Sequence, residues 1–190
     1  MIRIGILGDI GAGKSYVAKC FGYPVFNADL EVSKIYEKDK KIFYKLRKAF
    51  PKHFTSFPIK KKSVANAILE NKKNLKKIKK IIHFEIRKKM NIFLKKNKNK
   101  KFVILDIPLL LESKINAKKD ILIFVQSKKS DILKRLIKRK NYNEKLIKDF
   151  KKIQLSLDLK KKKSQYVIKN DFKKNSVKTM VKKILKEIKK

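Results

Sequence analysis

The 190-residue chain has no tryptophan, one cysteine, four prolines and five glycines. A single cysteine, Cys20, excludes an internal disulfide, and we interpret it as a buried structural thiol rather than a nucleophile. No apolar run approaches the roughly 18 residues that a membrane span needs. The apolar start leads into a glycine-rich loop instead of a cleavage site, so we expect no signal peptide, no membrane association and a cytoplasmic location.

Acidic residues are also scarce, with 16 Asp and Glu against 55 Lys and Arg and a formal net charge of +39. A charge of this size is typical of nucleic-acid-binding proteins. However, only five of the cations are arginine, the residue that makes bidentate contacts to bases. We therefore interpret most of the lysine as surface filler, from an AT-rich genome that also favours Ile, Asn and Phe. No specific nucleic-acid partner is expected, and the positive field can steer phosphate-rich substrates.

The few glycines matter most near the start, where Gly8 and Gly13 belong to the pattern G-x-x-x-x-G-K-S. This phosphate-binding loop exposes backbone N–H groups to an anion, helped by the positive end of the following helix. Lys14 can reach the outer phosphates of a nucleoside triphosphate, and the Ser15 hydroxyl can ligate Mg²⁺. A glycine-rich turn without a ligand is the alternative, but the strand before and the helix after favour phosphate binding. The nucleotide-binding residues predicted here are Gly8, Asp9, Ile10, Gly11, Ala12, Gly13, Lys14, Ser15 and Tyr16.

Short continuous apolar runs alternate with helical patterns, which predicts an α/β fold with a parallel sheet flanked by helices. The expected strands are residues 2–7, 23–26, 102–106, 121–125 and 166–168. The expected helices are 14–21, 30–50, a short helix capped by Ser63 that runs through residue 70, 72–96, 131–140 capped by Ser130, 144–157 capped by Asn143, and 175–190. We expect a single domain, 1–190, with a core of 1–29 and 102–190, a helical substrate-binding insertion of 30–101 and a lid of 140–158.

Two carboxylates follow expected strands at the edge where ligands of such sheets collect. Asp106 can hold Mg²⁺ or its water shell beside Ser15, and a strand-end cap is the alternative. Asp29 can accept the proton of an attacking hydroxyl. It can equally be an acid whose charge is favoured at the start of a helix, and the residues alone leave both interpretations open.

Two basic pairs have helical spacing. Arg135 and Arg139 are four residues apart on an expected helix, so both can point toward transferring phosphates as a lid pair, with a solvated basic face as the alternative. His83 and Arg87 repeat the spacing within the insertion. They can bind an anionic substrate, although a lone histidine on an apolar face is more often structural.

Together these motifs resemble those of the dephospho-coenzyme A kinases, nearly end to end, and imply a P-loop kinase-type fold. The matching elements are the Gly8–Ser15 loop, Asn27-Ala28-Asp29, Ile82-His83-Phe84-Glu85-Ile86-Arg87, Val103 through Asp106 and Pro108-Leu109-Leu110 to Glu112, Arg135 and Arg139 with Gln154, and Ile168-Lys169-Asn170. The loop alone is shared by many nucleotide kinases, and the other elements are more specific.

The resemblance implies transfer of the ATP γ-phosphate to the 3′-hydroxyl of dephospho-coenzyme A, with Mg²⁺. The implied catalytic residues are Asp29, Lys14 and Arg139. The implied residues beyond the loop are Arg135, Arg139 and Asn170 for ATP, and Asp29, His83, Arg87, Pro108, Leu109 and Leu110 for the acceptor. We expect a monomer, with a small homo-oligomer as the alternative. The competing functions are a P-loop kinase for another small acceptor and a basic ATP-dependent nucleic-acid-binding protein.

The chain departs from the family pattern at several positions. Asn27 replaces the first acid of D-A-D, which removes a charge near the metal. Phe84 replaces a proline, Leu111 an aromatic and Phe172 a small turn residue. Asp9 replaces a small residue of the phosphate loop, and we expect it to weaken nucleotide affinity unless its carboxylate turns away from the phosphates.

Overall fold

The computed structural model of the chain describes residues 1–139 and 142–189. It divides into two compact units, one of Met1–Asn27 with Leu94–Lys190 and one of Ala28–Phe93. The first two residues of the predicted lid, 140 and 141, lie outside the described residues.

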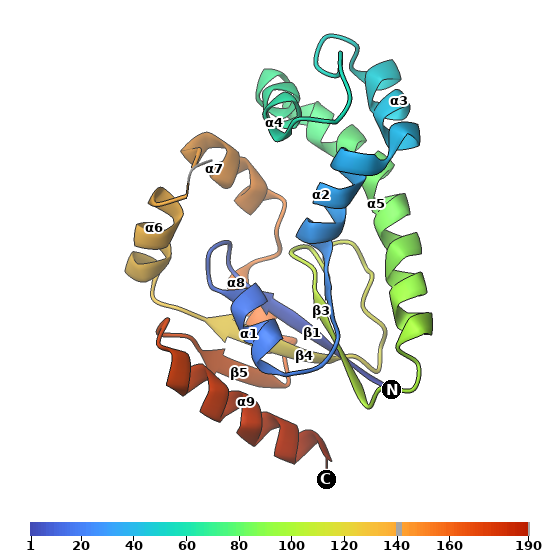
Figure 1. The fold of residues 1–190 in the computed structure, drawn as a ribbon. Coiled ribbons are helices and arrows are strands. Elements are labelled where there is room, and N and C mark those ends of the chain that lie inside the picture. The colour runs from blue at the N-terminus through green and yellow to red at the C-terminus, as the bar shows by residue number, and fades with distance from the viewer. Residues whose placement is uncertain (140–141, 190) are drawn as a thin grey trace. The chain divides into compact units, whose positions relative to one another are not determined.

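The described part of the first unit contains a five-stranded parallel sheet with the order β2-β3-β1-β4-β5 (Figure 1). The strands are β1 (Ile2–Gly8), β2 (Val25–Asn27), β3 (Phe102–Asp106), β4 (Ile121–Gln126) and β5 (Tyr166–Lys169). All of β3 and most of β1 and β4 are buried, as their continuous apolar sequences predict for central strands of a parallel sheet. The predicted α/β class is therefore confirmed.

The register of the sheet aligns the carboxyl ends of its strands at one edge. Asn27 at the end of β2 pairs with Asp106 at the end of β3, and Gly8 at the end of β1 pairs with Val125 of β4. Because the strands are parallel, their carboxyl ends and the loops that follow meet at this edge. The phosphate loop and the predicted metal ligands therefore share one side of the sheet.

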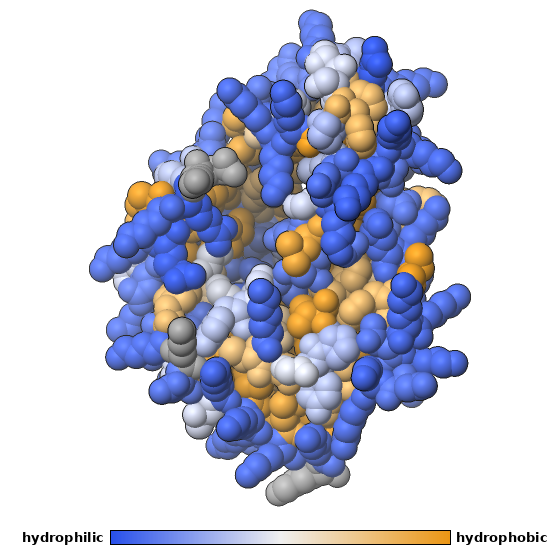
Figure 2. Space-filling model, viewed as in Figure 1, coloured by the Kyte–Doolittle hydropathy of each residue, from blue (hydrophilic) through white to orange (hydrophobic). Residues whose placement is uncertain are grey.

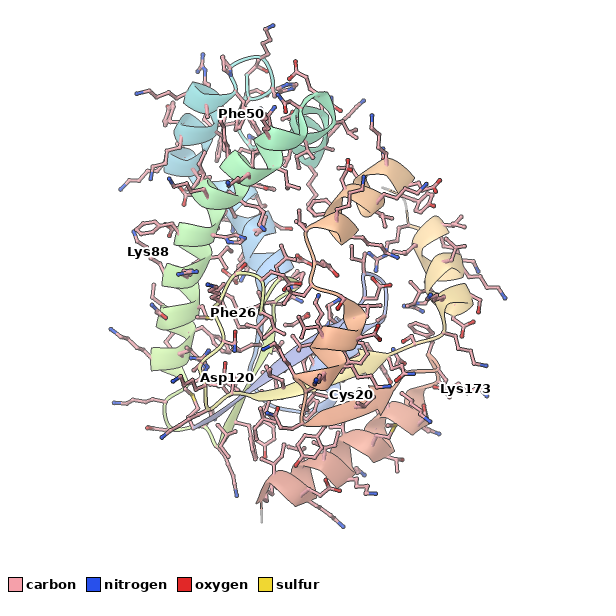
Figure 3. All side chains as sticks on the ribbon, turned by 180° about the vertical axis from the view of Figure 1, so that it is seen from behind. Cys20, Phe26, Phe50, Lys88, Asp120 and Lys173 are labelled. Atoms are coloured by element: carbon pink, nitrogen blue, oxygen red, sulfur yellow. The ribbon has the colours of Figure 1, made fainter. Side chains whose placement is uncertain are left out.

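Helices cover both faces of the sheet (Figure 1). The helices of this unit are α1 (Lys14–Cys20), α6 (Lys129–Ile137), α7 (Glu144–Lys152), α8 (Leu157–Lys162) and α9 (Lys174–Lys189). Helices α1 and α9 contact each other on one face, and α8 lies on the other (Figures 1 and 3). Val17, Ile168 and Val181 are almost fully buried between these layers.

An ion pair fixes the turn that leads into β4. The Arg3 guanidinium contacts the Asp120 carboxylate, with Nη2–Oδ2 and Nε–Oδ1 distances of 2.9 Å, and the Ala117 N–H donates to the same carboxylate. Burial raises the pKa of Asp120, and the Ala117 N–H and Arg3 oppose that rise. Asp120 is labelled in Figure 3, next to the start of its strand.

The second unit is helical, with α2 (Ala28–Lys38), α3 (Lys40–Ala49), α4 (Lys61–Glu70) and α5 (Lys72–Lys96), whose last turn belongs to the first unit. Its buried side chains include Ile35, Leu46, Phe54 and Ile78. Apolar residues three and four apart on α5 supply Leu75, Ile78, Ile82, Ile86 and Met90 to this core.

Several predicted boundaries were wrong, and caps explain two of them. The helix predicted over 30–50 is broken at Asp39, whose carboxylate accepts a hydrogen bond from Ile42 N at 3.0 Å and so starts α3. The helix predicted over 144–157 begins at its Asn143 cap but ends at Lys152, and Ser156 starts the separate α8. A local pattern of apolar residues does not reveal such breaks.

The other differences concern two serines, β2 and Cys20. Ser63 and Ser130 are not caps, because α4 and α6 begin before them and have no side-chain cap. Strand β2 begins two residues later than predicted. Cys20, labelled in Figure 3, is only partly buried, although it packs against the core.

Hydrophilic side chains cover most of the face shown in Figure 2, as the lysine content predicts. Smaller apolar patches lie between them. Within the described ranges, no helix has both the length and the apolar character needed to cross a membrane.

Candidate functional site

The phosphate loop is built on backbone angles that favour glycine. Gly8, Gly11 and Gly13 all have positive φ, at 144°, 88° and 87°. A Cβ at Gly13 would lie 2.3 Å from Asn170 Nδ2, and one at Gly8 would lie 2.6 Å from the carbonyl oxygen of Val125. Both angle and space therefore require glycine at these positions.

Lys14 folds back over the loop. Its Nζ lies 2.8 Å from the carbonyl oxygen of Asp9 and 3.3 Å from that of Gly8. These contacts hold the ammonium group against the loop, where the outer phosphates of a triphosphate are expected. Gly13 caps α1, so the loop also ends at the positive end of a helix.

Two side chains from outside the loop fix its position through the carbonyl oxygen of Ala12. Ser127 Oγ donates to this oxygen at 3.1 Å, and Asn170 Nδ2 donates at 2.9 Å. The Asn170 Oδ1 accepts from the Phe172 N–H, and Asn170 is only 2% exposed. Asn170 thus supports the loop in this structure. Its predicted contact with adenine stays a prediction, and its burial argues against a direct one.

The predicted metal ligands lie together at the carboxyl ends of the strands. Asn27 Nδ2 donates to Asp106 Oδ2 and lies 3.4 Å from Ser15 Oγ. Asp106 is buried, at 3% exposure. Across the described residues, no group of three or more His, Cys, Asp or Glu is arranged for a metal ion. One carboxylate and one hydroxyl still fit Mg²⁺, which keeps several waters and takes further oxygens from phosphates.

Asp9 turns its carboxylate toward a cation and a backbone N–H. Its Oδ1 accepts from Ile10 N at 2.7 Å, and its Oδ2 lies 3.4 Å from Lys151 Nζ on α7. Sequence reasoning missed Lys151, because it is one lysine among many. The Asp9 carboxylate therefore has a cationic partner and a backbone donor in this structure.

The two lid arginines differ in their surroundings. Arg135 lies on α6 with its guanidinium carbon 4.4 Å from the centre of the Phe172 ring, a cation–π contact beside the loop. The prediction that Arg139 shares this helix was wrong, because α6 ends at Ile137. Arg139 follows the helix as an exposed residue whose N–H donates to Leu136 O.

A cavity of about 490 Å³ lies beside the loop. Its lining comes from Asp9, from α6, from Lys151 and Gln154, and from the segment that joins α7 to α8. Apolar side chains, including Ile132, Leu136 and Leu155, make up much of this lining.

A buried ion pair anchors the α7–α8 junction, and the sequence did not single it out. Lys160 Nζ lies 2.8 Å from Glu112 Oε1, and the two side chains are 1% and 7% exposed. The same Glu112 oxygen accepts from Leu155 N at 2.9 Å, and Lys160 also donates to Gln154 Oε1 at 3.3 Å. Glu112 and Gln154 belong to the sequence motifs that resemble the family pattern. Their contacts in the structure show that they anchor the α7–α8 junction.

The segment after β3 carries three residues predicted to contact the acceptor. Pro108 and Leu109 are half-buried in a turn. Leu110 is fully buried, and its side chain fills the space above Gly5 of β1. Leu110 is therefore a core residue in this structure, and its predicted contact with the acceptor stays a prediction.

In the second unit, Asp29 is an exposed residue in the first turn of α2. Its carbonyl oxygen accepts from Ser33 Oγ at 3.0 Å. This position suits an acid that interacts with the helix dipole, and it equally leaves the carboxylate accessible to a hydroxyl group. Both interpretations of Asp29 therefore stand.

His83 and Arg87 lie one turn apart on the continuous helix α5. Burial lowers the pKa of His83, and the charges of Lys79 and Arg87 lower it further. His83 is half-buried and Arg87 is exposed. Lys79, which the sequence did not distinguish from its neighbours, extends this basic row by another turn.

Comparison with known proteins places these features in a family. The model of the family described as dephospho-CoA kinase matches residues 2–176. The chain is 33% identical over 187 residues to a dephospho-CoA kinase of Wolbachia sp. subsp. Brugia malayi, covering 96% of this chain and 95% of that one. It is 31% identical over 195 residues to one of Bacillus cereus, covering 98% and 96%.

Solved structures share the fold. The structure of TT1252 from Thermus thermophilus superposes with a TM-score of 0.76 at 23% identity, covering 98% of this chain and 97% of that one. Dephospho-CoA kinase from Campylobacter jejuni superposes with a TM-score of 0.64 at 22% identity, covering 98% of this chain and 96% of that one. A shikimate kinase from Acinetobacter baumannii gives 0.52 at 15% identity, covering 99% and 93%. The predicted P-loop kinase-type fold is confirmed, and from the extent of the family match the chain belongs to the dephospho-CoA kinase family.

Proposed function

We propose that the protein transfers the γ-phosphate of ATP to the 3′-hydroxyl of dephospho-CoA, forming CoA and ADP in the last step of coenzyme A synthesis. One observation carries the proposal: a complete phosphate loop adjoins the Ser15, Asn27 and Asp106 cluster in a chain of this family. The named activity of its relatives supports the choice of acceptor.

On the donor side, the loop N–H groups and Lys14 bind the phosphates of ATP, and Arg135 on α6 and Arg139 just before the lid approach them. Ser15 and Asp106 would hold Mg²⁺, partly through water. When bound, the ion would neutralise charge on the transferring phosphoryl group. Tyr16 follows on α1, where its partly buried ring packs against the core.

On the acceptor side, Asp29 accepts the proton of the 3′-hydroxyl as the new oxygen–phosphorus bond forms. The bond between the γ-phosphorus and the β–γ bridging oxygen breaks, and ADP leaves with that electron pair. His83 and Arg87 bind the acceptor, with Pro108 and Leu109 as further contacts. Positioning of the reacting groups and neutralisation of their charge matter more than the basicity of Asp29, because the transition state is loose.

The proposal also includes a cytoplasmic location, a monomeric state and the functional subregions. Residues 1–29 and 102–190 form the nucleotide-binding core, 30–101 the substrate-binding insertion and 140–158 the lid. Two compact units with boundaries at residues 27 and 94 support a division of this kind.

An acceptor screen tests the activity. The purified chain with MgATP should form ADP and CoA when dephospho-CoA is supplied, and it should leave shikimate and nucleoside monophosphates unphosphorylated. Turnover with another acceptor alone would show a different small-molecule kinase. Stimulation of ATP hydrolysis by nucleic acid, rather than weak salt-sensitive binding, would favour the nucleic-acid-binding alternative.

Asp29→Asn tests the assigned base. We expect kcat to fall by about 100-fold or more, since a positioned base contributes on that order, while the Kd for MgATP stays unchanged. Glu37→Gln is the matched control, because Glu37 is an exposed acid on the same helix. Equal losses in turnover and ATP binding would remove this role from Asp29.

A further inference from the structure

The phosphate loop contains its own carboxylate, on Asp9. Its side chain is 13% exposed, and it takes a hydrogen bond from Ile10 N at 2.7 Å. Lys14 contacts the backbone carbonyl oxygen of Asp9 rather than this carboxylate. A negative charge within a loop that binds phosphates repels the ligand, unless a cation neutralises it.

The neutralising cation comes from α7. Among the described residues, the ion pair of Asp9 is with Lys151, whose Nζ lies 3.4 Å from Oδ2. The neighbouring lysines of α7 pair within the helix, Lys148 with Glu144 at 2.7 Å and Lys152 with Asp149 at 3.9 Å. Lys151, unlike these two neighbours, forms its ion pair with the phosphate loop.

We propose that Lys151 is a positioning residue for the nucleotide, which acts by neutralising Asp9. The pair removes the repulsion between the Asp9 carboxylate and the phosphates, and it holds α7 against the loop. The inference rests on the proposed function only in taking ATP as the ligand of the loop. It also explains how a chain with an acid in this loop keeps a functional phosphate site.

The proposal predicts that the effect of Lys151 on ATP affinity depends on the Asp9 carboxylate. Removing Lys151 alone exposes the phosphates to an unpaired carboxylate, so ATP affinity falls. Removing the carboxylate alone takes away the remaining repulsion, so ATP affinity improves. Removing both should return affinity to the level of the variant without the carboxylate. A lysine that bound phosphates directly would not show this dependence, because its loss would weaken binding whatever residue stood at position 9.

The test is a double-mutant cycle on the full chain, with MgATP binding measured by calorimetry at low ionic strength without any acceptor. Lys151→Met should raise the Kd about threefold, the size expected for a partly exposed ion pair. Asp9→Asn, which keeps an oxygen for Ile10 N, removes the remaining negative charge of this side chain and should lower the Kd. In the Asp9→Asn background, Lys151→Met should have no effect. The Lys152→Met variant is the control and should bind like the unaltered chain.

Two further measurements distinguish charge neutralisation from a structural role. Lys151→Arg should restore affinity, and the effect of Lys151→Met should shrink at about 0.5 M salt, where screening is strong. An undiminished loss in the Asp9→Asn background, or no loss in the unaltered one, overturns the proposal. Because no acceptor is present, failure of the acceptor screen is a separate result. Absence of MgATP binding to the unaltered chain would overturn both.

Discussion

The phosphate loop and helix α5 hold their functional groups in different ways. The loop depends on three glycines with positive φ and on Ala12, whose carbonyl oxygen is fixed by Ser127 and Asn170. Helix α5 instead displays long side chains on a regular backbone. The phosphate loop therefore depends mainly on its main-chain geometry, whereas the predicted acceptor-binding groups on α5 are side chains. Substitutions in the loop should impair binding by changing its backbone conformation, and substitutions on α5 should impair binding by removing charge.

The largest effect is expected in the loop, at Gly13. Gly13→Ala places a methyl group 2.3 Å from Asn170 Nδ2 at a φ of 87°, so the loop cannot keep its form. MgATP binding should fall about 100-fold or become undetectable, as a misplacement of roughly 1 Å at a site can cost that much. The measurement is calorimetric titration with MgATP.

Gly22→Ala provides the control for backbone strain alone. Gly22 also has positive φ, at 70°, but a Cβ there meets no atom within 4 Å. We expect a loss of about 1–2 kcal/mol of stability and unchanged ATP affinity. Equal loss of binding in both variants would show that strain, rather than the contact with Asn170, explains the Gly13 result.

The next effect concerns the anchor of α7 and α8. Lys160→Met leaves the Glu112 carboxylate buried without its cation, and the free energy of unfolding should fall by about 3–5 kcal/mol. Urea denaturation measures this change. Adding Glu112→Gln should recover a large part of it, because the amide oxygen can still accept from Leu155 N. No recovery would mean that packing of the lysine stem matters more than charge.

A smaller effect is expected at His83 on α5. Burial and the charges of Lys79 and Arg87 lower its pKa, which favours the neutral imidazole in the free protein. Binding an anionic acceptor favours the protonated form and raises this pKa, so binding takes up a proton. The KM for dephospho-CoA should therefore fall roughly threefold as pH drops from about 8 to about 6. His83→Gln should remove the dependence, and persistence of the same profile would contradict this assignment.

The smallest effect is a cap that separates two helices. Asp39→Ala removes the hydrogen bond to Ile42 N and should lower stability by about 1 kcal/mol. Ser63→Ala is the matched control, since Ser63 lies inside α4 and makes no cap. It should change stability by less than about 0.5 kcal/mol. A thermal melt of the two variants distinguishes them.

The fold and the backbone form of the phosphate loop could be predicted because each has a local signal. Continuous apolar runs marked β1, β3 and β4, and the spacing of glycines marked the loop. Helix breaks at Asp39 and after Lys152 were missed, because they depend on side-chain caps inside otherwise helical patterns. The pairs of Asp9 with Lys151 and of Glu112 with Lys160 were missed for another reason. Each joins residues far apart in a chain with 55 basic residues, where no single lysine stands out.

Asn27 has a consequence for the order in which ligands arrive. Its amide, in place of an acid, leaves Asp106 as the carboxylate beside Ser15. A single carboxylate attracts free Mg²⁺ weakly, because this ion gives up its water reluctantly and is usually held by one or two carboxylates together with phosphates. In the proposed function the metal therefore enters already bound to ATP, and saturable binding of Mg²⁺ to the nucleotide-free protein would argue against this order. In that proposal, an amide rather than a carboxylate at position 27 makes MgATP, and not free Mg²⁺, the form in which the metal binds.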